Sequence, residues 1–380
     1  MKTEKQNYII YFYIYFIVQV IYILLHSYLP IYFYKILDVD RAKLAFVQII
    51  SYSALFVKPL ISIYFDKTEQ PKFSIRLILI IASSMISISL IALLMALPLL
   101  FIFAIFLGIN FAFTSVVDVI ADKVLIKKSE TEQKKNKNVL WIRLGAVFGA
   151  ITTPVLALIF SWSLIFISTV ILTFPLIFIV AFLGKPEYTQ DTKPLSKETL
   201  TLEYSIKNIA LLSLFAFLLY ADMLYEYPLE PFLVEYLGES IFSLLLLIFI
   251  IINAIGIVIA GLYSHKFERK KILFYNTIVV GIVLCLAPFT PFILFVILYG
   301  ILQILIGFIT VNLTSLMIDV SKEKVTIFQL IAAFVVLARV ILIPLGTYLS
   351  SFLGTEWIIF IAGGLFILAV IPLIFMNIER

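Results

Sequence analysis

The stretch KPEYTQDTKPLSKETLTLEYSIK, residues 185–207, is the longest polar segment of this 380-residue chain. It separates twelve apolar segments of about 20 residues each into six before it and six after it. Because a bilayer core takes about 20 apolar residues per helical crossing, the sequence predicts an all-α membrane protein with twelve transmembrane helices. With 63% hydrophobic residues and a mean hydropathy of +1.14, a soluble globular protein is excluded. The apolar runs are continuous, so an outer-membrane barrel is excluded as well.

The predicted crossings are residues 8–29, 44–65, 75–97, 99–121, 139–160, 162–184, 207–225, 241–263, 271–288, 291–318, 325–352 and 355–376. We expect an N-terminal six-helix half at 1–184, a cytoplasmic linker at 185–206 and a C-terminal six-helix half at 207–380.

The 28 Lys and Arg residues fall mostly on one side of these crossings. If the N-terminus is inside, the outer side keeps three basic residues, namely Lys35, Arg41 and Lys43. The predicted outer loop after the seventh crossing carries three acids and no basic residue: Glu230, Glu235 and Glu239. The positive-inside rule therefore predicts a cell-membrane protein with both termini in the cytoplasm. The net charge of +5 then reflects topology and not nucleic-acid binding.

Several classes of function have no support in the sequence. The N-terminal apolar run is too long for a cleavable signal peptide, and Cys285 is the single cysteine. No phosphate-binding Gly-Lys loop, metal-ligand cluster or nucleophile-base constellation occurs. We therefore expect no enzyme activity, no cofactor and no metal.

The two predicted halves repeat each other at an offset of about 200 residues. Arg143 is echoed by Arg339, and the set Asn110, Thr114, Ser115 and Asp118 recurs as Asn312, Thr314, Ser315 and Asp319. Two parallel six-helix halves joined by a linker are the layout of the major facilitator superfamily, which the chain resembles along its whole length. The resemblance implies two pseudo-symmetric halves around a central cavity lined by the first, fourth, seventh and tenth helices.

The loop between the second and third helices resembles a signature of that superfamily, a Gly four residues before an Asp that basic residues follow. Here Asp66 is followed by Lys67, Lys72 and Arg76, while Ser62 replaces the Gly. The resemblance implies that Asp66 and Arg76 help to latch the halves in one state. The alternative is that both are solvated loop charges.

A closer resemblance is to the folate and biopterin transporter family, and it covers mainly the first 150 residues. It rests on FVKPL at 56–60, YFYKIL at 32–37, VVDVIAD at 116–122, and RLG at 143–145 with Gly149. The resemblance implies a folate or pterin as substrate.

Three basic residues are predicted inside the membrane: Lys58, Arg143 and Arg339. An isolated charge at a helix centre costs at least about 2.5 to 3.5 kcal/mol, so each needs a partner, a water-filled cavity or a bound anion. Lys58 and Asp118 lie at comparable depth, so they either form a structural ion pair or belong to a substrate or proton site. The remaining alternative is that Lys58 snorkels to the membrane interface. For Arg339, an acidic partner and an anionic substrate both stay open.

Polar stripes run along the helices expected to line the cavity. Residues that share one helix face recur every three or four positions. The stripes are Tyr15, Gln19, Tyr22 and His26; Asn110, Thr114 and Asp118; and Gln303, Gly307, Thr310 and Thr314.

Asp222 and Glu226 lie one helical turn apart in the seventh span, ahead of Pro228 and Pro231. Two carboxylates on one face in a low-dielectric setting cannot both ionise cheaply, so at least one is expected to hold a proton. This pattern is typical of proton coupling. The alternative is that the helix unwinds at Pro228 and the acids face external water.

The sequence thus favours a monomeric secondary transporter of a small organic anion that alternates access between the two sides of the membrane, with proton coupling. The predicted substrate site comprises Gln19, Lys58, Asn110, Asp118, Arg143, Gln303 and Arg339. Transport or efflux of cationic or neutral compounds is the alternative, and a scaffold or receptor without transport is a third. Gly145 and Gly149 are expected to shape the interface between the halves.

Overall fold

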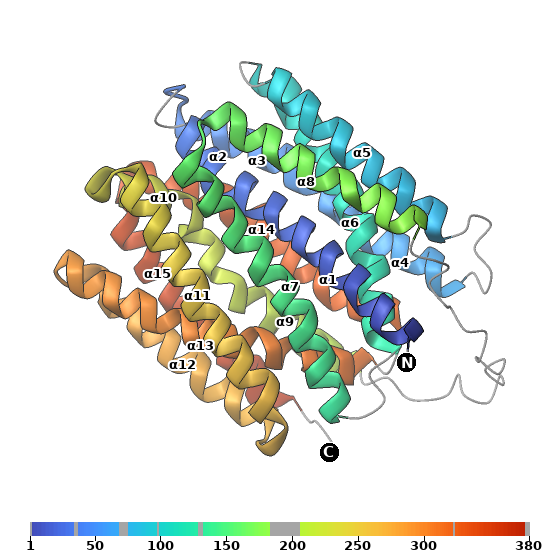
Figure 1. Cartoon of the computed structure of the whole chain (residues 1–380). Coiled ribbons are helices and arrows are strands. Elements are labelled where there is room, and N and C mark those ends of the chain that lie inside the picture. The colour runs from blue at the N-terminus through green and yellow to red at the C-terminus, as the bar shows by residue number, and fades with distance from the viewer. Residues whose placement is uncertain are drawn as a thin grey trace.

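The computed structural model describes residues 2–33, 37–67, 75–96, 99–127, 132–182, 206–321 and 324–376. Within these ranges the chain is almost entirely helical (Figure 1). The N-terminal half holds α1 (Lys2–Ile23), the π-helical turn η1 (Leu24–Tyr28), α2 (Leu29–Ile31), α3 (Arg41–Ser53), η3 (Ala54–Phe56), α4 (Val57–Lys67), α5 (Ile75–Ala96), α6 (Leu100–Lys127), α7 (Glu132–Ile159) and α8 (Trp162–Phe182). The C-terminal half holds α9 (Ile206–Leu219), η5 (Tyr220–Asp222), α10 (Met223–Leu237), α11 (Glu239–Tyr263), η6 (Ser264–Lys266), α12 (Arg269–Leu286), η7 (Ala287–Phe289), α13 (Phe292–Ser321), α14 (Val325–Leu353) and α15 (Thr355–Phe375).

Within the described residues, 10 helical stretches are long and apolar enough to cross a membrane. Two shorter apolar helices, Phe12–Ile23 and Trp162–Phe178, fall in the predicted first and sixth crossings. The beginnings of α1 and α7 and the end of α15 lie at one end of the bundle (Figure 1). Each crossing predicted from hydropathy therefore has its helix.

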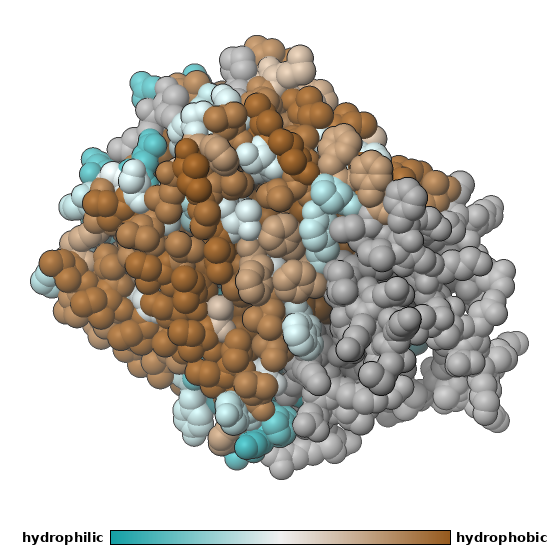
Figure 2. Space-filling view, viewed as in Figure 1, coloured by the Kyte–Doolittle hydropathy of each residue, from teal (hydrophilic) through white to brown (hydrophobic). Residues whose placement is uncertain are grey.

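The outside of the bundle is apolar, as a surface in contact with lipid must be. Figure 2 shows apolar side chains over the face that carries α11 and α12, with hydrophilic residues towards the ends. On α11 the exposed apolar side chains recur every three or four residues: Ile241, Leu244, Ile248, Ile251, Ile255, Ile259 and Leu262. This period places them on one face of the helix, which contacts lipid. The opposite face is buried in the protein, so the helix is apolar all round.

The two halves pack their helices in the same way. In the N-terminal half α1 packs on α7, α3 on α6, and α5 on both α6 and α8. In the C-terminal half α9 and α10 pack on α14, α11 on α13, and α12 on both α13 and α15. The halves meet through α7 on α11 and through α14 on α3 and α4. The pseudo-symmetry indicated by the sequence repeat is therefore present in the packing.

The predicted end of the seventh crossing at residue 225 is wrong. The chain bends in the 3-10 turn η5 and then continues as α10, with Pro228 and Pro231 inside the helix. Glu230 is consequently a buried helical residue, 6% exposed, and not part of an outer loop. Proline is tolerated within a transmembrane helix where neighbouring helices and local 3-10 turns compensate the lost hydrogen bonds.

Gly145 and Gly149 do allow close helix packing, but within one half. A Cβ on Gly145 or Gly149 would meet the backbone of Phe12 or Phe16 on α1. The expectation that they shape the interface between the halves is therefore wrong. At that interface the close approach is made by Gly261 on α11, where an added Cβ would lie 2.8 Å from Cβ of Leu140 on α7.

Gly346 on α14 fits against a carbonyl that proline has left free. Pro228 has no N–H group, so the carbonyl of Leu224 loses its helical donor. A Cβ on Gly346 would overlap this same carbonyl oxygen. Glycine is therefore the residue that lets α14 pack against the proline-containing part of α10.

We predict that Gly346→Ala lowers the thermal stability of the purified protein, because the added methyl group must push α10 and α14 apart. Such overpacking typically costs about 1 to 3 kcal/mol. Gly364→Ala on α15 is the matched control, since nothing lies within 4 Å of its added Cβ. The measurement is the unfolding temperature in detergent, and equal values for both variants would contradict the packing argument.

Candidate functional site

Two adjoining cavities lie where the halves meet. The first, of about 270 Å³, is lined from α1, α7, α10, α11 and α13, and we call it the acidic cavity. The second, of about 200 Å³, is lined from α1, α4, α6, α7, α13 and α14, and we call it the mixed cavity. Gln19, Arg143 and Ala146 belong to the walls of both. The hollow between the halves therefore has two compartments.

The acidic cavity takes its name from Asp222, Glu226 and Glu230, which follow one another at intervals of four residues. The side chain of Asp222 caps α10 by accepting a hydrogen bond of 3.1 Å from the Met223 N–H. Oε2 of Glu226 and Oε2 of Glu230 are buried and have no hydrogen-bond partner among the described residues. Because α10 stays helical through Pro228, these acids line an interior cavity and do not lie on an unwound segment.

Tyr22 on α1 joins the acidic cavity to the mixed cavity. Its hydroxyl donates a hydrogen bond of 3.3 Å to Oε1 of Glu226. The guanidinium carbon of Arg339 lies 4.8 Å from the centre of the Tyr22 ring, in a cation–π contact. Nε of Arg339 is buried without a partner, and no hydrogen bond or ion pair joins Arg339 to any described residue. The acidic partner expected for Arg339 is therefore nearby but not directly paired with it.

Arg143 reaches from the N-terminal half to the C-terminal half. Its Nη2 donates a hydrogen bond of 2.8 Å to Oγ1 of Thr314 on α13. Because Arg143 lines both cavities, its charge is available to a solute in either compartment.

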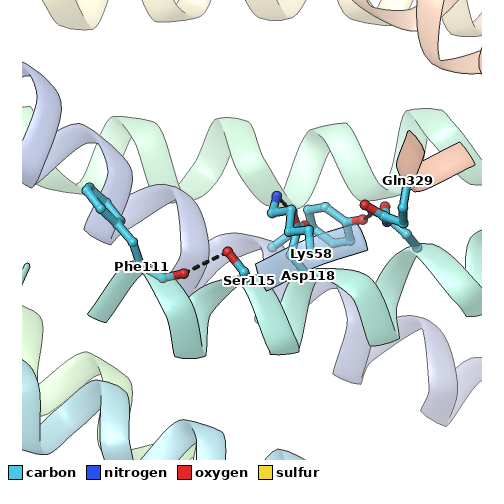
Figure 3. Close-up of polar contacts among 7 residues, drawn as sticks. Lys58, Phe111, Ser115, Asp118 and Gln329 are labelled. Carbon is cyan, nitrogen blue, oxygen red and sulfur yellow. Dashed lines mark hydrogen bonds and ion pairs between the residues drawn. The ribbon is translucent and has the colours of Figure 1, made fainter. Parts of the chain in front are cut away.

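The ion pair between Lys58 and Asp118, one of the two arrangements considered for these residues, is present in the mixed cavity. Their side chains are 16% and 18% exposed. One turn further along α6, Asp122 accepts hydrogen bonds from Tyr15 (2.7 Å) and from Nε2 of Gln329 (2.8 Å). Figure 3 shows Lys58 beside Asp118, with Gln329 reaching in from α14. Asp122 and Gln329 come from different halves, so this hydrogen bond fastens the halves together.

Asn110 lies apart from this site. It is fully buried, and its Nδ2 donates to Oγ of Ser89 at 2.9 Å on α5. Its repeat partner Asn312 likewise donates to Oγ of Ser264, at 3.0 Å. Neither residue lines the two cavities. The repeated asparagines thus join helices within each half, and Asn110 is not part of the site we propose.

Gln19, Gln303 and Thr310 do line the acidic cavity, as the stripes on the first and tenth helices predict. Gly307 instead packs closely against the backbone of Asn253 on α11. Asp66 lies in the last turn of α4 and Arg76 in the first turn of α5. Their side chains, and that of His26, lie outside the described part of the structure, so the predicted latch stays a prediction.

Three residues of the site were not singled out from the sequence: Glu230, Asp122 and Gln329. Glu230 continues the four-residue spacing of Asp222 and Glu226, but the two prolines concealed its place in a helix. Asp122 follows Asp118 by four residues and was noted only as part of a motif. Nothing in the local sequence marks Gln329, because its role depends on a distant helix. Its hydrogen-bond partner Asp122 is 207 positions away in the chain.

Residues 211–380 match the family model of the Major Facilitator Superfamily. No curated protein matches the sequence. A D-xylose-proton symporter is similar in structure, with 13% identity, a TM-score of 0.78 and coverage of 98% of each chain. The nucleoside transporter NupG has 16% identity, a TM-score of 0.72 and coverage of 98% of this chain and 99% of its own. The human organic anion transporter MFSD10 has 12% identity, a TM-score of 0.69 and coverage of 97% and 99%.

At these identities the similarity establishes the fold, and the fold covers almost the whole chain. The chain is therefore an integral membrane protein with the major facilitator fold, as the sequence predicted. The resemblance to folate and biopterin transporters in the first 150 residues stays a prediction.

Hydrogen bonds join the halves at both ends of the bundle. The Gln329–Asp122 bond closes one end, while Nη1 of Arg41 donates to Oγ of Ser350 at 3.0 Å near the other. We predict that Gln329→Ala opens the first end, because a hydrogen bond to a charged group contributes about 1.5 to 3 kcal/mol. A change of about 1 to 3 kcal/mol alters the ratio of two states by about 5- to 150-fold.

The measurement is the labelling rate of single cysteines, with Cys285 first replaced by serine. Ala332→Cys places a probe in the mixed cavity and Leu245→Cys places one in the acidic cavity. Gln329→Ala should raise labelling at the first probe, whereas the mirror control Ser350→Ala should raise it at the second. Identical rates with and without Gln329→Ala would show that this hydrogen bond does not hold the end closed.

Proposed function

We propose that this protein is a secondary active transporter that works by alternating access and carries a small organic solute with an anionic group. The observation that carries the proposal is the pair Arg339 and Glu226. They line the two cavities and both contact Tyr22, yet they form no ion pair with each other. Charges left unpaired in a membrane protein are costly and are typical of a substrate or ion pathway. A scaffold or receptor would not need them.

Arg143 and Arg339 are the residues we assign to the anionic group of the solute, because a guanidinium binds carboxylates and phosphates with two parallel hydrogen bonds. Lys58 is paired with Asp118, so in this proposal it positions that carboxylate and does not bind solute directly. A similar structure is described as an organic anion transporter, which supports the assignment. Folates and pterins are the first solutes to test, on the resemblance of the N-terminal motifs.

Proton coupling is the second part of the proposal, and it rests on Asp222 and Glu226. Both line the acidic cavity, and no described residue forms a hydrogen bond with Oε2 of Glu226. A carboxyl group in such a place exchanges a proton at lower cost than it carries a permanent charge. One of the similar structures is described as a proton symporter, which supports this reading.

Transport of cationic or neutral compounds is a second candidate, favoured by the acidic cavity. Three carboxylates line it against a single guanidinium, that of Arg143.

We further propose a monomer in the cell membrane with both termini in the cytoplasm, on the distribution of Lys and Arg. Asp66 and Arg76 are proposed as gate residues on the cytoplasmic side.

For the anion site we predict that Arg339→Gln lowers uptake of an anionic solute at least 10-fold, since removing a desolvated charge partner costs about 2 to 5 kcal/mol. Membrane insertion should not change. The assay is uptake into proteoliposomes of a solute found by a thermal-shift screen of folates, pterins, sugars, amino acids and cationic drugs, because a bound ligand stabilises the folded state. Lys43→Gln, which removes an exposed charge, is the control. Uptake at the wild-type rate would remove Arg339 from the site.

For coupling we predict that Glu226→Gln keeps solute exchange but loses accumulation against a gradient, because exchange needs no net change in the protonation of the carrier. Both modes are measured in proteoliposomes with an imposed pH gradient, with and without a protonophore. Glu235→Gln, an exposed carboxyl on the same helix, serves as the matched control. A Glu226→Gln variant that still concentrates solute would exclude this carboxyl from coupling.

A further inference from the structure

The charged residues of the two cavities are segregated by sign. The acidic cavity holds three carboxylates and one guanidinium, those of Asp222, Glu226, Glu230 and Arg143. The mixed cavity is lined by three cationic side chains, Lys58, Arg143 and Arg339, against two carboxylates, Asp118 and Asp122. The hollow between the halves therefore has a negative compartment beside a compartment with an excess of positive charge.

In the mixed cavity, the carboxylates already have partners. Asp118 pairs with Lys58, and Asp122 accepts hydrogen bonds from Tyr15 and Gln329. Arg339, in contrast, has a cation–π contact and no hydrogen bond or ion pair with a described residue. The available charge in this compartment is therefore the positive charge of the arginines.

In the acidic cavity the available groups are acceptors. In the described part of the chain, Oε2 of Glu226 and Oε2 of Glu230 have no hydrogen-bond partner, and Glu230 is 6% exposed. Buried polar groups are almost always hydrogen-bonded in a complete structure, so these groups indicate a ligand that donates hydrogen bonds.

Tyr22 shows how close the two compartments are. It contacts Glu226 through its hydroxyl and Arg339 through its ring, so a single aromatic side chain spans the two charges. Gln19, Arg143 and Ala146 are shared walls. A small molecule is able to reach both charges at once.

We propose that the solute is a zwitterion, a small molecule with an ammonium group and a carboxylate or other anionic group. The anionic group lies against Arg143 and Arg339, and the ammonium group lies against Glu226 and Glu230. This inference rests on the proposed transport function and names its substrate class. It also explains why the cavities show features of both an anion site and a cation site.

The rings around the acidic cavity suit the rest of such a molecule. Tyr225, Tyr299 and Phe249 line it, and the Phe249 and Tyr299 rings pack edge to face with centroids 5.1 Å apart. Aromatic faces attract ammonium groups as well as apolar chains. An aromatic or aliphatic amino acid therefore fits the lining better than a charged sugar does.

The test is equilibrium binding to the purified full-length protein, measured as the shift in unfolding temperature over a concentration series. Two sets of probes separate the charges. One set is phenylalanine, 2-phenylethylamine and 3-phenylpropionate; the other is 4-aminobutyrate, butylamine and butyrate. We expect at least one zwitterion to bind at least 10-fold more tightly than both of its single-charge analogues.

Variants then assign the two poles. Arg339→Gln should reduce the affinity of the zwitterion to that of the amine, and Glu226→Gln should reduce it to that of the acid. Lys43→Gln and Glu235→Gln, which remove exposed charges, should keep the preference. Arg339→Lys retains the positive charge and should restore most of it, which guards against a glutamine variant that fails to fold.

The proposal is overturned if no zwitterion shifts the unfolding temperature, or if the amine or the acid binds as tightly as the zwitterion. Because binding is measured without a membrane gradient, the outcome is independent of transport. Zwitterion binding without uptake in proteoliposomes would refute the proposed function and leave the site standing. Proton-driven uptake of an anion with no advantage for the zwitterion would do the reverse.

Discussion

A charge inside a membrane protein needs a partner, and this constraint organises the whole structure. Each half contains an ion pair that satisfies this constraint. Lys58 pairs with Asp118 in the N-terminal half, and Arg269 pairs with Asp319 in the C-terminal half. Among the charged residues that line the cavities where the halves meet, six have no direct charge partner in the described part of the chain: Arg143, Arg339, Asp122, Asp222, Glu226 and Glu230. Each half thus contains an ion pair of its own, whereas the charges without a charge partner lie at the interface between the halves, where a bound solute is able to pair with them.

Proline and glycine residues of the C-terminal half determine how closely the helices that carry these charges pack. Pro228 and Pro231 lie inside α10, which carries Glu226 and Glu230. The carbonyl freed by Pro228 is covered by Gly346 of α14, the helix that also carries Arg339. Proline and glycine therefore bring the acidic helix and the arginine helix into close contact. The same pair of helices would have to separate slightly if Gly346 acquired a larger side chain.

The sequence repeat predicts helix packing within each half better than it predicts which residues line the cavities. Asn110 and Asn312 recur because each joins two helices inside its own half, not because they line the cavity. Arg143 and Arg339 also recur, yet their partners differ, since Arg143 bonds to Thr314 while Arg339 rests on the ring of Tyr22. The two halves thus share their helix packing but make different contacts where they meet.

Hydropathy alone determined the twelve crossings, the two halves and the intramembrane charges, because a bilayer imposes length and polarity on each segment separately. The four-residue spacing of Asp222 and Glu226 also predicted that they share a helix face. The positions of Lys58 and Asp118 along their helices suggested that they pair. Only the tertiary structure decided that Glu230 is interior, that Gln329 meets Asp122, and that Arg339 and Glu226 share Tyr22. These contacts join residues that lie more than 200 positions apart in the chain and in different halves. No local pattern encodes such a contact, because it arises where separately folded helices pack against one another.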